Sequence, residues 1–428
     1  MTKAEDKKWM ALDNAALIYP AAKRRNWTAL FRISAELSEQ IDKDILFEAE
    51  KSTLARFPGF ASKLKKGTFW YYLERMEGAP KIQKDVANPC VRMNLKENGG
   101  FMFRVRYYDK RIAVEIFHVL ADGTGGLCFL KTLVAEYLRL KYGDDIPRDD
   151  TILDCSETAH EEEIEDSYQR YARREKESRR ESIAYRIHGT KEREHYMNIT
   201  TGIIDTAEVI KKSRSYGVSI GEYLCAVLIQ SVYRRQQRES DAGRRRKPVK
   251  ICVPVNLRKF YGSRTMRNFA SYVNPGIEPR LGKYEFEEIT KIVKYQMGLE
   301  VTEKRLNAKM TTNVATGRNK ALRVVPLFIK NPTLKFGFWM NGDRNTSSII
   351  SNLGLVKLPE PMQSRVKRMD FMLGSLRYNP VTCACLSYGG KMCINFTRSI
   401  KEADIEREFF RELVRQGIHV TVESNRRD

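Results

Sequence analysis

The sequence lacks the features that mark membrane-spanning, secreted or metal-binding proteins. Its longest uninterrupted apolar run, Tyr223 to Ile229, has seven residues, far fewer than the about 18 that cross a bilayer. No apolar stretch of signal-peptide length follows the charged N-terminal residues, so we expect a cytoplasmic protein. The eight cysteines contain no CxxC pair, and the five histidines are not clustered at metal-ligand spacing. We therefore expect neither a disulfide framework nor a bound metal.

Acidic residues are fewer than basic residues in this sequence. Lysine and arginine outnumber aspartate and glutamate by 76 to 54, which gives a net charge of +22. Such a surplus favours anionic partners, including phosphate-bearing cosubstrates and anionic membrane surfaces. The basic residues are spread along the whole chain, however, as they are on an ordinary solvated surface. We therefore expect no specific nucleic-acid partner, and we leave peripheral contact with a membrane open.

Length and patterning predict two units of mixed secondary structure. A chain of 428 residues is too long for one ordinary core. Strand-like and helix-like segments alternate along it, which predicts an α/β fold. From about residue 144 to 193 the chain is highly charged and poor in large apolar residues, so we interpret it as an exposed, partly helical crossover. We expect a first unit over 1–180, ending inside this crossover, and a second over 194–428.

The second half contains one long predicted helix and several short strands. Apolar residues recur at helical spacing from Phe286 to Asn307, which predicts a single helix there. Strands are expected at 249–255 and 269–273, and a hairpin is expected to turn at Gly389 and Gly390. A further strand is expected in SSIISNLGLVKLP, residues 347–359.

One histidine, His118, stands out by its surroundings. It closes an alternating run in which Ile112, Val114 and Ile116 share one face of a predicted strand. The glycine-rich stretch DGTGG, residues 122–126, then leads into a helical pattern that ends near residue 143. A strand end beside glycines is a place where a side chain can face a cleft and a ligand can approach the backbone. The residues alone leave a catalytic histidine and a core or surface histidine equally open.

The chemistry that suits such a histidine is general base catalysis. A neutral imidazole near pH 7 can take a proton from a hydroxyl or amine that attacks an acyl carbonyl. The sequence contains no GxSxG nucleophile elbow, and no serine or cysteine nearby is arranged for covalent catalysis. If His118 is catalytic, this pattern favours direct transfer between two bound substrates.

The stretch HVLADGTGG, residues 118–126, resembles the HxxxDG signature of the chloramphenicol acetyltransferase-like superfamily. That superfamily includes peptide-synthetase condensation domains, wax ester and diacylglycerol synthases, and alcohol acetyltransferases. The order of LFRISAEL, RFPGFASKLKKGTFWYYLE, CVPVNLR and RNFASYVNPGI along the chain is similar too, so the resemblance covers most of it. It is strongest to bacterial alcohol acetyltransferase-like proteins. Position 117 is Phe, where condensation domains usually carry a second histidine, and this disfavours carrier-bound substrates.

The resemblance implies both a fold and an activity. It implies two chloramphenicol acetyltransferase-like subdomains, each a mixed sheet with flanking helices, with an active-site tunnel at their interface. It implies an acyltransferase that moves acetyl or a longer acyl group from CoA directly to a small alcohol or amine. Acyl-CoA would be a co-substrate, with no permanently bound cofactor. Two alternatives remain: a condensation-type enzyme using carrier-protein thioesters, and a non-catalytic relative that binds an anionic ligand or partner.

The resemblance also assigns roles around the HxxxDG stretch. His118 would be the general base, and Asp122 a structural residue that pairs with an arginine from another strand. Arg32, in LFRIS, is a candidate for that arginine. Gly123 would keep the tunnel entrance open for the acyl donor. No lysine or arginine stands out as a ligand of CoA.

Two stretches of the second half receive roles in the same way. Ser351 would donate a hydrogen bond to the oxyanion of the reacting acyl group, with Asn352 behind it. The alternative is that residues 351–354 only form a turn that closes a strand. The residues expected to shape the interface between the halves are Asn256, Arg258 and Asn268.

Overall fold

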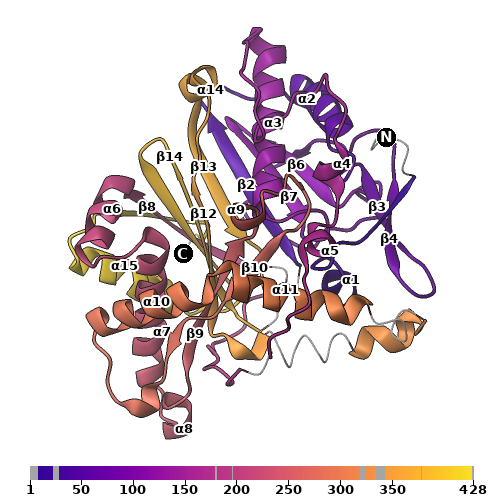
Figure 1. Ribbon diagram of the computed structural model, residues 1–428. Helices are drawn as coiled ribbons and strands as arrows, with labels where there is room; N and C mark the ends of the chain where they lie inside the picture. Colours follow the sequence, from indigo (N-terminus) through magenta and orange to yellow (C-terminus); the bar gives the residue numbers. More distant parts are fainter. Residues whose placement is uncertain are drawn as a thin grey trace.

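A computed structural model describes residues 8–22, 28–178, 181–194, 196–318, 324–333, 343–376 and 378–426. Within these ranges the chain forms two large mixed sheets, a small three-stranded sheet, and helices packed around them (Figure 1). The predicted α/β class with two mixed sheets is therefore confirmed. No helix in this part of the chain is long and apolar enough to cross a membrane.

The first large sheet contains the strand that leads to His118. Its strand order is β13-β2-β7-β6-β5, with only the β5–β6 pair parallel. The strands are β2 (Leu30–Leu37), β5 (Gln83–Lys84), β6 (Phe103–Tyr108), β7 (Arg111–Phe117) and β13 (Val366–Leu373). The small sheet has the order β1-β4-β3 and is built from β1 (Trp9–Ala11), β3 (Ser62–Lys66) and β4 (Tyr71–Arg75).

The second large sheet has eight strands and is built from the second half alone. Its order is β10-β9-β12-β14-β15-β8-β16, and β11 also pairs with β9. The pairs β9–β12 and β12–β14 are parallel and the others antiparallel. The strands are β8 (Asn198–Asp205), β9 (Val249–Asn256), β10 (Ala270–Val273), β11 (Gly276–Ile277), β12 (Ser348–Leu355), β14 (Val381–Tyr388), β15 (Lys391–Arg398) and β16 (Val420–Ser424).

Helices pack around these sheets. In the first half they are α1 (Ile18–Ala22), α2 (Lys43–Arg56), α3 (Gly123–Tyr142), α4 (Glu161–Ile164) and α5 (Ser167–Tyr171). In the second they are α6 (Thr206–Ser215), α7 (Ile220–Gln237), α8 (Ala242–Arg245), α9 (Arg258–Tyr261), α10 (Phe286–Glu300), α11 (Glu303–Arg318), α14 (Glu360–Arg365) and α15 (Asp404–Arg415). Short 3₁₀ turns lie at Pro279–Leu281 and Asp343–Asn345.

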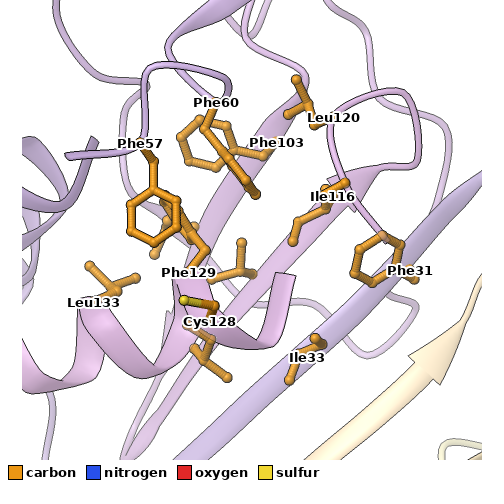
Figure 2. Close-up of a cluster of buried hydrophobic side chains, with 14 of the residues drawn as sticks. Phe31, Ile33, Phe57, Phe60, Phe103, Ile116, Leu120, Cys128, Phe129 and Leu133 are labelled. Atoms are coloured by element: carbon orange, nitrogen blue, oxygen red, sulfur yellow. The ribbon is translucent and has the colours of Figure 1, made fainter. Parts of the chain in front are cut away.

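Helix α3 is the central helix of the first half. Asp122 caps its first turn, and Gly143 ends it in the left-handed conformation that glycine favours. Its apolar side chains pack against the first sheet and α2. Figure 2 shows this core, in which Phe129 of α3 stacks on Phe60 at 4.4 Å between ring centres and contacts Phe103 of β6 edge-on. This packing fixes the helix, and with it the loop that follows His118.

Strand β13 connects the two halves. It belongs to the second half of the sequence, yet it pairs antiparallel with β2 over its whole length and lies beside it in Figure 1. On its other side, Asn395 of β15 donates a 3.0 Å hydrogen bond to the Phe371 carbonyl, and Thr397 donates one of 2.8 Å to the Leu373 carbonyl. The two large sheets therefore meet at β13. The division of the chain into 1–180 and 194–428 remains a prediction.

One expectation about a helix is wrong, and the expectation of an exposed, partly helical crossover holds except at a few buried residues. The helix expected from Phe286 to Asn307 is broken, because α10 ends at Glu300 and Val301 leaves the helical conformation. The β-branched pair Val301-Thr302 favours a break at this point. The exceptions in the crossover include the side chains of Glu163 and Tyr168, which are buried. Glu163 is satisfied there by an ion pair with Arg56, and Tyr168 exchanges hydrogen bonds with the backbone of β10.

Candidate active site

His118 follows directly after the last residue of β7. Its backbone N–H still bonds to the Ala29 carbonyl at 2.9 Å, and the chain then turns through Leu120 toward α3. The imidazole stacks on the ring of Tyr19 at 4.9 Å and meets the edge of Phe31 at 5.1 Å. The side chain is closely surrounded but remains partly exposed to solvent. Packing therefore holds the orientation of a ring that is not fully enclosed.

The side chain of Asn268 determines which nitrogen of His118 carries the proton. Its amide nitrogen donates to Asp13 Oδ2 at 3.1 Å and to the His118 carbonyl at 3.0 Å. With the nitrogen facing two acceptors, the amide oxygen faces the imidazole, 2.9 Å from Nδ1. An amide oxygen only accepts hydrogen bonds, so Nδ1 carries the hydrogen and Nε2 keeps its lone pair. This is the tautomer that a general base acting through Nε2 needs.

The environment also keeps His118 uncharged. Burial lowers the pKa of His118 below its usual 6.5, and this outweighs the opposing effects of Asp122 and the Asn268 hydrogen bond. At neutral pH the imidazole is therefore neutral and able to accept a proton.

Asp122 joins the loop after His118 to the second half of the chain. One carboxylate oxygen accepts from the backbone N–H groups of Thr124 and Gly125, both at 3.1 Å. The other accepts from Arg258 Nη1 and from the Phe269 N–H, both at 2.8 Å. Burial would raise the pKa of Asp122, but Arg258 and these N–H donors hold it below its usual 3.8. Asp122 is therefore a charged residue whose carboxylate is bound by these donors, and its structural role stays a prediction.

The expectation that Arg32 pairs with Asp122 is wrong. Arg32 lies within β2 opposite Glu115 of β7, and its guanidinium contacts Asp85 at 2.5 Å and Glu115 at 3.2 Å. Both acids are buried beside it, so its charge is already balanced there. The partner of Asp122 is Arg258, the first residue of α9, which was expected only to shape the interface.

The glycines after Asp122 allow close packing, between the two halves at Gly125 and within the first half at Gly126. A Cβ at Gly125 would overlap the carbonyl oxygen of Met266, and one at Gly126 would lie 2.6 Å from the ring of Phe31. At Gly123 it would lie 2.7 Å from Leu353 Cδ2, the end of a flexible side chain. Close packing therefore explains why Gly125 and Gly126 carry no side chain. The role of Gly123 at a tunnel entrance stays a prediction.

Ser351 lies in β12, whose end reaches the same region. Ile350 points into the core of the second half, so Ser351 and Leu353 share the opposite face, and Leu353 contacts Gly123. The Ser351 side chain is partly exposed. Asn352 accepts a 2.8 Å bond from the Gly354 N–H and closes a turn at the strand end. Residues 351–354 therefore combine a strand with a turn, and the oxyanion role of Ser351 stays a prediction.

The residues expected to shape the interface do contact both halves. Asn256 donates to the Thr124 hydroxyl at 3.2 Å, and Arg258 donates to the backbone carbonyls of Thr265 and Arg267 at 2.9 and 2.5 Å. Sequence reasoning missed the contact between Asn268 and the imidazole, and it missed Asp13 altogether. The spacing of about 100 to 250 residues between these groups leaves no local pattern from which to find them.

Comparisons with known proteins show the fold. No protein-family model matches the sequence, and a search of curated proteins finds no relative. Among solved structures, polyketide synthase associated protein 5 from Mycobacterium tuberculosis is similar over 95% of this chain and 96% of its own, with 15% identity and a TM-score of 0.62. TRI101 from F. sporotrichioides, complexed with coenzyme A and T-2, is similar over 98% and 100%, with 11% identity and a TM-score of 0.64.

A condensation domain has the same fold. The first condensation domain of the calcium-dependent antibiotic synthetase, in complex with a substrate analogue, is similar over 96% of this chain and 99% of its own, with 12% identity and a TM-score of 0.63. Acetyltransferases that bind coenzyme A and condensation domains are thus both among the structural neighbours. The predicted resemblance to the chloramphenicol acetyltransferase-like superfamily is confirmed at the level of the fold.

Proposed function

We propose that the protein is an acyltransferase that moves an acyl group from acyl-CoA directly to a small alcohol or amine, with His118 as the general base. The observation that carries this proposal is the state of the imidazole. It is neutral, partly accessible, and held with Nδ1–H on Asn268, so that Nε2 is the free basic nitrogen. The binding of coenzyme A and a small acceptor by TRI101, which has the same fold, supports the choice of substrates.

The proposed reaction needs no covalent intermediate on the protein. Nε2 takes the proton of the acceptor hydroxyl or amine as its oxygen or nitrogen forms a bond to the acyl carbon. The thioester carbonyl becomes an oxyanion, which the Ser351 hydroxyl stabilises by donating a hydrogen bond. When the oxyanion collapses, the carbon–sulfur bond breaks and the CoA thiolate takes the proton from Nε2. The products are the ester or amide and free CoA, and His118 is neutral again.

Asp122 and Arg258 take no part in the proton transfer. Their ion pair holds the loop after His118 against the second half. This keeps the base at a fixed position relative to the acyl carbon. Much of the rate would come from holding both substrates together. A location in the cytoplasm and a tunnel at the interface remain predictions that fit this activity.

The test is a thiol-release screen of several acyl-CoAs against alcohols and amines, with His118→Ala beside the wild type. We expect the variant to lose about 10²- to 10⁴-fold in kcat, the usual contribution of a general base. His419→Ala is the matched control, because His419 is exposed in the second half and should leave kcat unchanged. Ser351→Ala should cost about 10²- to 10³-fold.

The pH dependence of kcat/KM identifies the base. Because burial lowers the pKa of His118 below its usual 6.5, the midpoint of the acid limb of kcat/KM should lie below pH 6.5. Full activity of His118→Ala would contradict the proposal. Activity only with a phosphopantetheinylated carrier thioester would identify a condensation-type enzyme instead. Salt-sensitive binding of an anionic partner without any thiol release would identify a non-catalytic relative.

A further inference from the structure

One corner of the molecule holds several large apolar side chains in solvent. It consists of the turn between β3 and β4 together with residues 324–333, which we call the exposed corner. The five side chains and their exposed fractions are Phe69 36%, Trp70 56%, Val324 70%, Ile329 51% and Phe328 73%. Single exposed apolar residues need no explanation, but a group of this size marks an interaction site.

Three hydrogen bonds hold the two parts of the exposed corner together. The Leu327 N–H donates to the Thr68 carbonyl at 2.9 Å, and Lys330 Nζ donates to the Phe69 carbonyl at 2.8 Å. Asn331 donates to the Tyr71 hydroxyl at 2.9 Å. Figure 1 shows the tip of the β3–β4 hairpin beside the orange chain of this segment.

The contacts also explain which side chains remain exposed. Leu327 is buried against the hairpin, with only 3% of its surface exposed. Phe328 and Ile329 follow it in a helical turn, where successive residues point about 100° apart. They therefore point away from the surface that Leu327 covers and form, with Trp70, an apolar edge fixed by main-chain bonds.

Four lysines lie on the two segments that form the exposed corner. Lys63, Lys65 and Lys66 lie on β3, which leads into the turn, and Lys330 lies on the helical segment. Glu74 of β4 accepts from Lys63 at 2.8 Å and from Lys65 at 3.4 Å, which leaves the group with a positive surplus. Lys66 is exposed beside the turn.

We propose that the exposed corner docks on the surface of an anionic lipid bilayer. Tryptophan and phenylalanine side chains enter the region between head groups and acyl chains, and lysines next to them face the lipid phosphates. An apolar protein surface would match the aromatic side chains but not the lysines on the same two segments, so the charge favours the bilayer. The inference rests on the exposed corner alone and does not depend on the proposed acyl transfer.

The experiment is co-sedimentation of the full-length protein with lipid vesicles. Vesicles of phosphatidylcholine with phosphatidylglycerol should bind the protein, vesicles of phosphatidylcholine alone should bind it more weakly, and added salt should reduce the difference. The double variant Trp70→Ser with Phe328→Ser should weaken binding to the anionic vesicles by about tenfold or more. The pair Lys65→Glu with Lys66→Glu should remove the preference for anionic vesicles.

A matched control lies on α10. Tyr295 and Leu299 are 67% and 65% exposed, so Tyr295→Ser with Leu299→Ser removes a similar apolar area from another part of the molecule and should leave binding unchanged. Equal weakening by this control would overturn the proposal, as would a wild type that binds neither kind of vesicle. A double variant at Trp70 and Phe328 that binds vesicles normally but changes from dimer to monomer in light scattering would identify a second copy as the partner, and would also overturn it.

The lysine variant keeps the test decisive if the double variant at Trp70 and Phe328 fails to fold. Its two positions are exposed on β3, so the fold should tolerate the change, and circular dichroism would check this. Retained preference of that folded variant for anionic vesicles would contradict the proposal.

Discussion

Two buried aspartates lie near His118, and the structure shifts their pKa values in opposite directions. Asp122 is held by Arg258 at 2.8 Å and by three backbone N–H groups, and its pKa lies below 3.8. Asp13 is completely buried, and its nearest guanidinium nitrogen, Arg267 Nε, is 3.6 Å away. Burial raises the pKa of Asp13 above 3.8 in spite of that arginine.

The difference separates two tasks that a histidine base needs. Asp122 is a fixed charge that fastens the loop to the other half of the chain. Asp13 orients the amide of Asn268, and through it the imidazole. Under the proposed function, Asp122 therefore contributes chiefly to stability, and Asp13 contributes to the chemistry of the ring. The following predictions test this division.

The largest expected effect is on stability. Arg258→Ala leaves Asp122 buried without its cation, which should cost about 3 to 5 kcal/mol in the free energy of unfolding, measured with urea. Arg264→Ala is the control, because Arg264 pairs with Asp150 on the surface, where both side chains are about half or more exposed. That change should cost less than about 1 kcal/mol. Equal losses would show that the Asp122 ion pair is no structural clamp.

A middle-sized effect is expected on catalysis. Asn268→Leu keeps the volume and removes the acceptor of Nδ1–H, so kcat should fall by about 10- to 100-fold, part of what the base supplies. The hydrogen bond that His118 Nδ1–H donates to Asn268 raises the pKa of His118. Its loss should therefore move the acid limb of kcat/KM to lower pH.

The control for that variant is Asn256→Leu. Asn256 bonds to Thr124 and Arg258 but not to the imidazole, so it should leave the acid limb in place. If both variants lowered kcat without moving the limb, Asn268 would be only a packing residue.

The smallest expected effect is a difference in pH dependence. Between pH 3.8 and the raised pKa of Asp13, the folded protein binds more protons at this site than the unfolded chain does. The Asp13 contribution to stability therefore falls as pH rises through that window. For Asp122 the sign is opposite, because its folded pKa lies below 3.8, and its contribution is lost as pH falls through the folded pKa.

Urea unfolding at a series of pH values checks this sign. Asp13→Asn should gain stability relative to the wild type as pH rises above 3.8, by about 1.4 kcal/mol for each pK unit by which Asp13 is shifted. Asp122→Asn should lose relative stability as pH rises to 3.8 and should stay below the wild type at neutral pH. Parallel curves for the two variants would contradict the division between the aspartates.

Local patterns predicted most of the first sheet and the position of His118. The alternation of apolar residues before His118 reflects strand β7, and the glycines after it reflect the first turn of α3. Both patterns lie in consecutive residues, so the sequence alone predicts them. The identity of the arginine partner could not be read in this way. Arg32 and Arg258 are both arginines near predicted strands, and only the register of β2 against β7, which places Arg32 opposite Glu115, decides between them.

The positioning of the imidazole is a product of tertiary structure alone. Asp13, His118 and Asn268 come from three separate segments, and each has an ordinary local sequence. The break after Glu300 had only a weak signal, the β-branched pair Val301-Thr302 inside an otherwise helical pattern. No local sequence signal indicated the burial of Glu163, because its partner Arg56 lies 107 residues away.

Strand β13 has a consequence for how the protein is made. Its residue Phe371 pairs with Ile33 of β2, so β2 must wait for more than three hundred residues to be synthesised before this edge is covered. At about 5 to 20 residues per second, the wait is on the order of 20 to 70 s. During that time β2 presents an open edge to other chains, which makes nascent protein prone to aggregation. A fragment ending near residue 180 would keep that edge permanently.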